Sequence, residues 1–194
     1  MTKALKRVID ITASLILLAA FAPLMLAIVL AIICESPGGA FFRQRRAGLR
    51  GREFEVIKFR SMRPGRPGQG HATGKRDPLI TRVGGLLRRT SLDELPQLFS
   101  VLTGDMSLVG PRPLLLPSIR PDERIRLEMQ PGITSLAAVS GRQSLTWDER
   151  MALDRLYVEN WSLWLDMRIL GRTIPVALSQ TNVYDSDGEM KARS

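Results

Sequence analysis

The 194-residue chain contains only one cysteine and one histidine, the residues on which most structural metal sites and disulfides depend. Cys34 cannot form a disulfide within the chain, and His71 cannot build a multi-histidine metal site or redox centre. A serine triad would have to use His71, which lies in a glycine-rich stretch. The chain also lacks a Walker or Rossmann glycine motif. These absences argue against metal-cluster proteins, ordinary kinases and dehydrogenases.

Charge is distributed unevenly along the chain. Residues 1–89 carry 17 basic and 5 acidic side chains, whereas the remainder carries 11 basic and 14 acidic ones. We therefore expect the first half to face an anionic partner. The hydrophobic fraction of 44% is too high for a disordered chain, and with 24% charged residues it does not suit a polytopic transporter. One apolar anchor on a soluble body fits the composition.

The apolar run from Ile11 to Cys34 contains 24 residues without a charge. A helix of this length extends about 36 Å, which is enough to cross a bilayer. A cleaved signal peptide would use the small residues at positions 20–22, but Pro23 would then follow the cut and further apolar residues come after it. A third arrangement is a re-entrant hairpin, because Pro23 at the centre of the run deletes a helical hydrogen bond and bends the helix.

The flanking charges favour the re-entrant hairpin over a spanning helix. Basic residues stand on both sides of the apolar run, and the positive-inside tendency places both flanks in the cytoplasm. The freed polar groups of a bent backbone need partners, and the run offers only Thr12 and Ser14. At the boundaries, we expect Asp10 to be a helix-start or ion-pair residue and Cys34 to be buried, with acylation as its alternative.

Periodicity after residue 36 predicts an α+β body of short elements. A basic β-hairpin next to the membrane is expected from residues 40–45 and 53–59, and a buried strand from 133–139. Helices are expected over 79–89, 92–102, 121–129, 147–160 and 161–178, and a surface loop with His71 over 64–78. The capping-box pattern Thr146-x-x-Glu149 opens the fourth helix. The last helix suits a lipid interface, although packing in the core is an alternative.

The most informative local motif joins two adjacent carboxylates, Asp93 and Glu94, to basic residues on both sides. One interpretation is a helix cap, in which Ser91 and Glu94 form a capping box or Asp93 caps a helix that has Pro96 in its first turn. The other interpretation is catalytic, because neighbouring helical residues point about 100° apart and cannot both face the core. A helix N-terminus would also lower a carboxylate's pKa.

An ionised carboxylate among arginines is typical of phosphoryl chemistry. A carboxylate can attack phosphorus to form an acyl phosphate, while arginines and a divalent ion neutralise the phosphate oxygens. Arg112 lies between Pro111 and Pro113 and therefore loses little freedom on binding. A second carboxylate suits Mg²⁺, which prefers oxygen ligands and retains water. The residues thus predict phosphoryl transfer at a membrane surface.

Four motifs of this chain resemble the bacterial sugar transferase family, the small monotopic polyprenyl-phosphate phosphoglycosyl transferases. They are Lys58-Phe-Arg-Ser-Met62, Thr90-Ser-Leu-Asp-Glu-Leu-Pro-Gln-Leu98, Gly104-Asp-Met-Ser-Leu-Val-Gly-Pro-Arg-Pro113 and Pro131-Gly-Ile-Thr134. The resemblance extends from Lys6 to about Ile174, and implies transfer of a sugar 1-phosphate from a UDP-sugar to undecaprenyl phosphate, with release of UMP and with Mg²⁺.

The resemblance also implies roles for individual residues. Asp93 matches the nucleophile that forms a covalent phosphosugar intermediate, and Glu94 matches the residue that assists with the metal and the proton. Positions implicated in phosphate or substrate binding correspond to Lys58, Arg88 and Arg112, and further active-site positions to Arg142 and Asp166. Pro23 matches the proline that breaks the family's re-entrant helix. Three residues near Arg142 depart from the family pattern, namely Ser135, Ala138 and Ser140.

We therefore expect a re-entrant anchor over residues 1–36, a cytoplasmic catalytic domain over 37–178 and a polar tail over 179–194. The expected location is the cytoplasmic face of a bacterial inner membrane. The expected partners are a UDP-sugar, undecaprenyl phosphate and membrane lipid, with a homodimer as a further candidate and no nucleic acid. The alternative function is a non-catalytic scaffold that binds anionic lipid through its basic half. That alternative leaves Asp93, Glu94 and Arg112 without a role.

Overall fold

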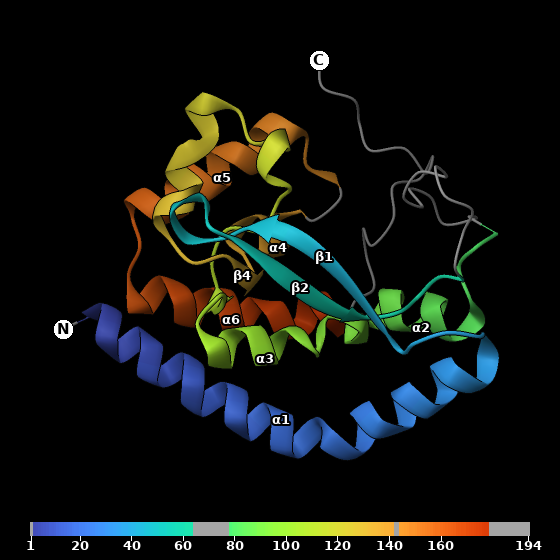
Figure 1. Cartoon of the computed structure of the whole chain (residues 1–194). Coiled ribbons are helices and arrows are strands. Elements are labelled where there is room, and N and C mark those ends of the chain that lie inside the picture. Colours follow the sequence, from blue (N-terminus) through green and yellow to red (C-terminus); the bar gives the residue numbers. More distant parts are fainter. Residues whose placement is uncertain (1, 64–77, 142–143, 179–194) are drawn as a thin grey trace.

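The computed structural model describes residues 2–63, 78–141 and 144–178 of the chain (Figure 1). Arg142, His71 and the expected tail over 179–194 lie outside these residues. The fold begins with one long helix, α1 (Thr2–Glu35), followed by the hairpin of β1 (Phe41–Ala47) and β2 (Glu53–Phe59). The later elements are short helices, 3₁₀ turns and a second small sheet, so the α+β class is confirmed.

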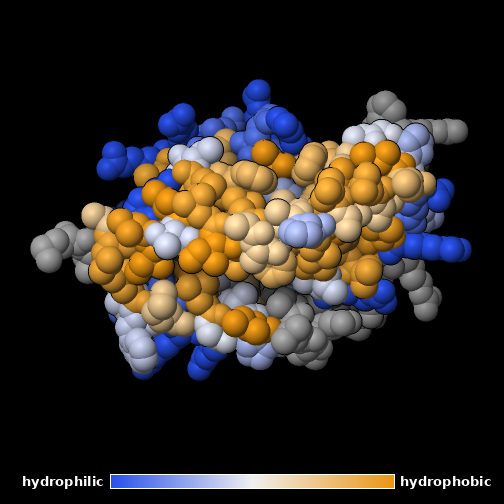
Figure 2. Space-filling model, turned by 90° about the horizontal axis from the view of Figure 1, so that it is seen from below, coloured by the Kyte–Doolittle hydropathy of each residue, from blue (hydrophilic) through white to orange (hydrophobic). Residues whose placement is uncertain are grey.

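Among the described residues, α1 is the one helix that is long and apolar enough to cross a membrane. Only 17% of its most apolar stretch is buried inside the molecule. Figure 2, viewed from the α1 side, shows apolar residues over most of this face. Pro23 lies inside a continuous helix, and Figure 1 shows that α1 is bent, so the expected break takes the form of a bend. The exposed Cys34 contradicts the expectation that it is buried.

Both ends of α1 contact the same folded body. Near its start, Asp10 accepts hydrogen bonds from the Ser107 hydroxyl at 2.8 Å and the Leu108 N–H at 3.1 Å, so Asp10 is neither a helix start nor an ion-pair residue. Near its end, Ile28 and Ile32 pack in a cluster of buried apolar residues. The cluster is completed by Ala40, Phe59 and Leu87. Both ends of α1 therefore pack against the folded body, while the apolar stretch of the helix stays mostly exposed.

The hairpin is confirmed, with β1 ending two residues later than expected. Its inner face buries Phe54 and Val56 in the main core, while the strand ends near α1 are fixed by the Arg60 side chain on the Ser36 and Pro37 carbonyls, both at 2.8 Å. Figure 1 shows the turn between the strands far from α1. The expected basic hairpin thus has only its open end next to the anchor.

The chain after the hairpin forms three short elements, α2 (Arg82–Thr90), the 3₁₀ turn η2 (Leu92–Glu94) and α3 (Gln97–Thr103). A single helix over 92–102 was expected, but Ser91 adopts φ 57° and Pro96 has no N–H to donate, so the first turn is separated from α3. A parallel pair follows, of β3 (Ser107–Val109) with β4 (Gly132–Thr134).

The expected strand over 133–139 and helix over 121–129 are wrong in part. The strand stops at Thr134 because the Ser135 hydroxyl accepts from the Ala138 N–H at 3.0 Å and caps α4 (Leu136–Ser140). Residues 121–128 form a 3₁₀ helix, η4 (Pro121–Glu128), rather than an α-helix. A shorter 3₁₀ turn, η3 (Leu116–Ser118), precedes it, and η1 (Leu49–Gly51) closes the hairpin.

The last two helices complete the core. The predicted capping box of Thr146 and Glu149 is confirmed at the start of α5 (Trp147–Glu159). In α6 (Leu163–Leu178), Ile169 is buried in the main core, whereas the Trp164 side chain is 64% exposed. One face of α6 therefore packs in the core, which confirms that alternative, while the lipid interface expected for the helix stays a prediction for its exposed face.

Candidate active site

Asp93 and Glu94 lie in η2, at the junction between α2 and α3. Neither caps a helix: the Ser91 side chain makes no capping hydrogen bond, and α3 begins after Pro96 without a side-chain cap. The cap interpretation is therefore wrong. Ser91, with its left-handed φ of 57°, ends α2, so both carboxylates lie in the short turn between α2 and α3.

Glu94 is held by two cations on one oxygen. The Lys58 Nζ of β2 donates to its Oε1 at 2.6 Å, and the Arg112 Nη2 donates to the same oxygen at 2.9 Å. Burial alone would raise the pKa of Glu94, whose side chain is 16% exposed, but the charges and hydrogen bonds of Lys58 and Arg112 lower it to about 2. Glu94 therefore remains ionised at all physiological pH values.

Asp93 has the opposite electrostatic environment. Burial and the neighbouring Glu94 charge raise the pKa of Asp93 to about 6, against the opposing charges of Lys58, Arg112 and Arg88. The expectation of a lowered pKa is thus wrong for this residue, because desolvation and repulsion exceed any effect of a helix end. No hydrogen bond joins its carboxylate to another residue in the described ranges. The Asp93 carboxylate is therefore available to a ligand.

The structure thus brings together five of the predicted site residues from separate parts of the chain. Lys58 ends β2, Arg88 lies in the last turn of α2, and Arg112 follows β3. Three cations surround two carboxylates, so the local charge favours an anionic ligand such as a phosphate group. The Arg112 side chain remains 44% exposed and can reach a ligand from solvent.

The donor set fits a loosely held magnesium ion. The described residues contain no cluster of three or more histidine, cysteine or acidic side chains, which excludes a zinc-type cage among them. Mg²⁺ is usually bound through one or two carboxylates together with water and substrate phosphate oxygens. Asp93 and Glu94 would provide the two carboxylates, and a phosphate ligand would provide the remaining oxygens.

Asp166, a further predicted site residue, belongs to a different buried cluster. Its carboxylate accepts from the Lys6 Nζ at 2.6 Å, the Tyr157 hydroxyl at 2.8 Å and the Trp161 indole N–H at 3.1 Å. Lys6 and Tyr157 also donate to the Val109 carbonyl, each at 3.1 Å. Asp166 therefore joins α1 and α6 to the strand that leads to Arg112, and does not contact Glu94.

Two residues that the sequence motifs did not single out reach the site from behind. Arg126 of η4 donates to the Arg112 carbonyl at 2.6 Å and forms a buried ion pair with Asp154 of α5 at 2.7 Å. Burial raises the pKa of Asp154 to about 6, against the charges of Arg126, Arg150 and Arg112. In the sequence, Arg126 and Asp154 are only charged residues within patterns that otherwise face the core. This signal is too weak to identify the two residues as an ion pair.

Comparison with known proteins gives a consistent result. Residues 1–180 match the family described as bacterial sugar transferase. A UDP-glucose:undecaprenyl-phosphate glucose-1-phosphate transferase of Caulobacter vibrioides is 46% identical over 191 residues, covering 92% of this chain and 72% of the relative. An uncharacterized sugar transferase of Bacillus subtilis, EpsL, is 39% identical, with coverage of 94% and 92%.

A longer relative matches over a smaller part of its length. The undecaprenyl-phosphate galactose phosphotransferase of Salmonella typhimurium is 39% identical over 199 residues, which cover 93% of this chain and 42% of that protein. The matched region therefore recurs in relatives of different lengths.

Proposed function

The chain belongs to the bacterial sugar transferase family and is a transferase, and we propose that it transfers a sugar 1-phosphate from a UDP-sugar to undecaprenyl phosphate. The products are undecaprenyl-diphospho-sugar and UMP. The observation that carries the proposal is the unequal pair of Asp93 and Glu94 among three cations: Glu94 is fixed and ionised, whereas Asp93 is unengaged. The names of the relatives support the same donor and acceptor classes.

The proposed reaction proceeds in two displacements at one phosphorus atom. An Asp93 carboxylate oxygen attacks the phosphorus that carries the sugar, the bond from this phosphorus to the bridging oxygen breaks, and UMP leaves with that oxygen. A phosphate oxygen of undecaprenyl phosphate then attacks the same phosphorus and the Asp93 carboxylate leaves. The chain needs no oxidant or further reactant for this exchange.

The surrounding residues have separate roles in this proposal. Lys58, Arg88 and Arg112 neutralise the phosphate oxygens, so that an anionic nucleophile can approach. Glu94 orients Lys58 and Arg112 through its shared oxygen. The proton-transfer role that the family resemblance implies for Glu94 does not suit a group with a pKa of about 2. Together with Asp93, Glu94 would hold Mg²⁺, which supplies charge neutralisation at the transferring phosphate when bound. Arg142, which lies outside the described residues, is assigned to the same machinery on the family resemblance. Asp166, whose buried carboxylate is held by Lys6 and Tyr157, is instead assigned to the support of the segment that leads to Arg112.

The acceptor lipid requires the enzyme to work at a membrane. We place residues 1–36 in the membrane as a re-entrant anchor, residues 37–178 in a catalytic body on the cytoplasmic face of the bacterial inner membrane, and residues 179–194 in a polar tail. The contacts at both ends of α1 support this arrangement, because Lys6 and Ile32 touch one body and a straight crossing would separate them. The basic flanks of the apolar run support it too.

The first experiment measures UMP release from UDP-sugars by the purified chain in detergent with undecaprenyl phosphate and Mg²⁺. UDP-glucose and UDP-galactose are the first donors to test, since the relatives act on glucose and galactose phosphates by name. We expect UMP release that requires the donor and stops on chelation of the metal. Binding of anionic vesicles without UMP release from any donor would instead support the scaffold alternative.

The second experiment tests the covalent step with a donor radiolabelled in the sugar. Wild-type protein quenched without acceptor is expected to retain the label, and addition of undecaprenyl phosphate is expected to release it. Asp93→Asn removes the anionic nucleophile with little change of shape, so it should abolish both labelling and turnover. Glu94→Gln should slow both half-reactions without moving the label elsewhere. Absence of label in the wild type, with initial rates that fit only a ternary complex, would show direct attack by the lipid phosphate.

A further inference from the structure

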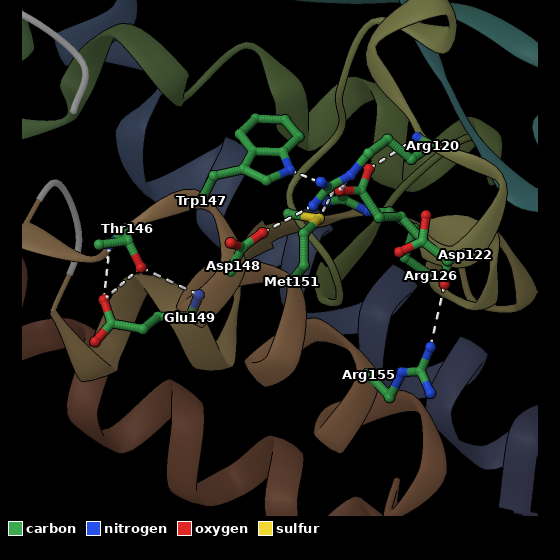
Figure 3. Close-up of polar contacts among 10 residues, drawn as sticks. Arg120, Asp122, Arg126, Thr146, Trp147, Asp148, Glu149, Met151 and Arg155 are labelled. Carbon is green, nitrogen blue, oxygen red and sulfur yellow. Dashed lines mark hydrogen bonds and ion pairs between the residues drawn. The ribbon is translucent and has the colours of Figure 1, made fainter. Parts of the chain in front are cut away.

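The element behind the Arg112 segment is an unusually long 3₁₀ helix. η4 extends over eight residues, whereas 3₁₀ helices rarely exceed about four. Polar contacts with α5 stabilise it (Figure 3): Glu123 accepts from the Trp147 indole and the Arg120 guanidinium, both at 2.6 Å, and Arg120 also reaches Asp148 at 2.8 Å. Arg155 donates to the Asp122 carbonyl at 3.1 Å. η4 is therefore fixed by side chains of α5.

From this fixed element, Arg126 extends toward the site. Its side chain is 3% exposed, and its Nη2 lies 2.7 Å from the Asp154 Oδ2 and 2.6 Å from the Arg112 carbonyl oxygen. Its Nη1 approaches the Met151 sulfur at 3.3 Å, as Figure 3 shows. One guanidinium nitrogen thus links a carboxylate of α5 to the backbone of Arg112.

The hydrogen bond from Arg126 to the Arg112 carbonyl restricts a part of the backbone that can otherwise still move. Pro113 restricts the preceding residue to extended conformations, but within that range the peptide plane after Arg112 can still tilt. A donor on the Arg112 carbonyl fixes this plane, and with it the direction in which the side chain leaves toward Glu94. The Arg126 contact therefore restrains the backbone from which the exposed guanidinium extends.

Asp154 supplies the negative charge that allows Arg126 to be buried beside Arg112. A guanidinium removed from water needs a counter-charge, and Asp154, with a side chain 2% exposed, is the carboxylate that Arg126 contacts. Arg150 and Arg112 are also close enough for their charges to oppose the rise of the Asp154 pKa, and the charge of Arg126 acts in turn on Arg150. Without Asp154, the buried Arg126 would lose the carboxylate that it contacts while Arg150 stayed nearby.

We propose that Arg126, held by Asp154, is a positioning residue that directs the Arg112 guanidinium to the phosphate group of the substrate. The inference rests on the proposed function for the identity of that phosphate. It assigns no contact between Arg126 and substrate: the effect is transmitted through the Arg112 backbone.

The decisive variant replaces the whole pair, Arg126→Met together with Asp154→Leu. Exchange of a buried ion pair for apolar residues of similar size generally preserves stability, whereas loss of one partner does not. We expect a thermal unfolding midpoint close to wild type and a fall in kcat/KM of about a hundredfold, the scale reported for small misplacements of a catalytic group. Wild-type turnover in this folded variant would make the pair merely structural and overturn the proposal.

A matched control uses the other ion pair between the same two elements. Asp148→Asn removes the surface partner of Arg120 and leaves both Arg126 and the Arg120–Glu123 pair in place, so kcat/KM should remain within about twofold of wild type. An equal loss in this control would attribute the effect to movement of η4 as a whole.

Coupling to Arg112 distinguishes positioning from a general effect. In an Arg112→Lys background, the Arg126→Met/Asp154→Leu replacement should cost little further activity, because the group that it positions has gone. Fully additive losses would contradict transmission through Arg112. Should the pair replacement not fold, Arg126→Lys keeps the charge beside Asp154 and should lower kcat/KM about tenfold through its different donor geometry. An unchanged kcat/KM in that variant would equally overturn the proposal.

A crystal structure of the pair variant separates this inference from the proposed function. We expect the Arg112 Nη2 to leave hydrogen-bond distance of the Glu94 Oε1, which is 2.9 Å in the wild type. This result does not depend on activity. An unchanged Arg112–Glu94 contact would overturn the inference, whereas a wild-type enzyme without UMP release would overturn only the proposed function.

Discussion

Adjacent residues with the same functional group acquire different properties from their contacts. Glu94 has two cationic donors on one oxygen and a pKa of about 2, whereas burial and the Glu94 charge raise that of Asp93 to about 6. In the proposed mechanism, the fixed group therefore orients the cations and the unengaged group attacks phosphorus. Sequence reasoning identified both residues, but the direction of the Asp93 pKa shift needed the neighbours that only the fold supplies.

Arg112 offers the first prediction at this scale. One guanidinium nitrogen contacts Glu94, and the same planar group has further N–H donors for a phosphate. Arg112→Lys retains the charge but replaces the planar fork by a single ammonium, so we expect kcat/KM to fall about a hundredfold. The measurement is UMP release under saturating acceptor. Arg120→Lys, on the surface, is the control, and near-normal turnover of Arg112→Lys would show that its geometry is unimportant.

Two glycines, Gly110 and Gly132, allow the close approach of the β3 and β4 segments just before Arg112. A side chain at Gly132 would collide with the backbone of Gly110, and one at Gly110 with the Gln130 carbonyl. Since the collisions involve backbone, the small parallel sheet must open to accommodate them. The segment from Gly110 to Arg112 would move with it.

We therefore predict that Gly132→Ala destabilises the protein by about 1–3 kcal/mol, the usual cost of overpacking, and lowers turnover as well. Gly171→Ala in α6 is the matched control, because an added methyl there meets nothing within 4 Å. Thermal unfolding and UMP release of the two variants measure the effect. Equal behaviour of both variants would contradict a role for close approach in this sheet.

At the level of elements, η4 depends on the ionised form of Glu123. Burial raises its pKa, but hydrogen bonds from Trp147 and from the backbone and side chain of Arg120 outweigh burial, and the net pKa is lowered. A lowered pKa stabilises the fold above the ordinary carboxyl pKa, and this contribution is lost as the pH falls through the lowered value.

Glu123→Gln is accordingly expected to destabilise the protein by about 2 kcal/mol near neutral pH, the scale for hydrogen bonds to a charged group. The difference from wild type should shrink as the pH falls below the ordinary carboxyl pKa and through the lowered pKa of Glu123, where its side chain becomes neutral like that of Gln. Thermal unfolding over this range provides the measurement. Asp122→Asn, at the exposed neighbouring acid, should leave stability unchanged at every pH, and a constant difference for Glu123→Gln would refute the assignment.

Elements with a strong local signal were predictable, and those fixed by distant contacts were not. The hairpin alternates and the Thr146 capping box is explicit, so both were found in the sequence. The strand expected over 133–139 was wrong after Thr134, because Ser135 caps a helix. The β3–β4 pair has three residues in each strand, too few for any periodicity.

The candidate site likewise contains residues that the sequence predicted and residues that it did not. Lys58, Glu94 and Arg112 belong to motifs that resemble a known family, and the structure brings them into contact. Arg126 and Asp154 belong to no such motif, and their relation to Arg112 depends on the packing of η4 against α5. A residue that contacts a backbone carbonyl cannot be recognised from a pattern of side-chain types, because every residue has such a carbonyl.

At the scale of the whole molecule, the anchor and the body form one folded unit. Both ends of α1 contact the body, at Lys6 and at Ile32, while its apolar face stays exposed (Figure 2). An apolar face of this extent is suited to lipid rather than to water. The basic half of the chain adds attraction to an anionic membrane surface.

The topology prediction follows from these contacts. Single cysteines at Thr2 and Arg50 should both resist an impermeant thiol reagent applied to intact cells, because both ends of the anchor are expected on the cytoplasmic side. The background must carry Cys34→Ser, since Cys34 is exposed. Permeabilised cells serve as the control for reactivity. Labelling of the cysteine at position 2 alone in intact cells would establish a spanning helix.

The buried pair of Lys6 and Asp166 has a consequence for biogenesis. The two residues are 160 positions apart, so the anchor leaves the ribosome long before its carboxylate partner has been translated. At about 5–20 residues per second, this interval is on the order of ten seconds. During it, the Lys6 amine is without the carboxylate partner with which it is later buried. The final helix thus secures the first, and the nascent chain can complete its fold only after α6 has been synthesised.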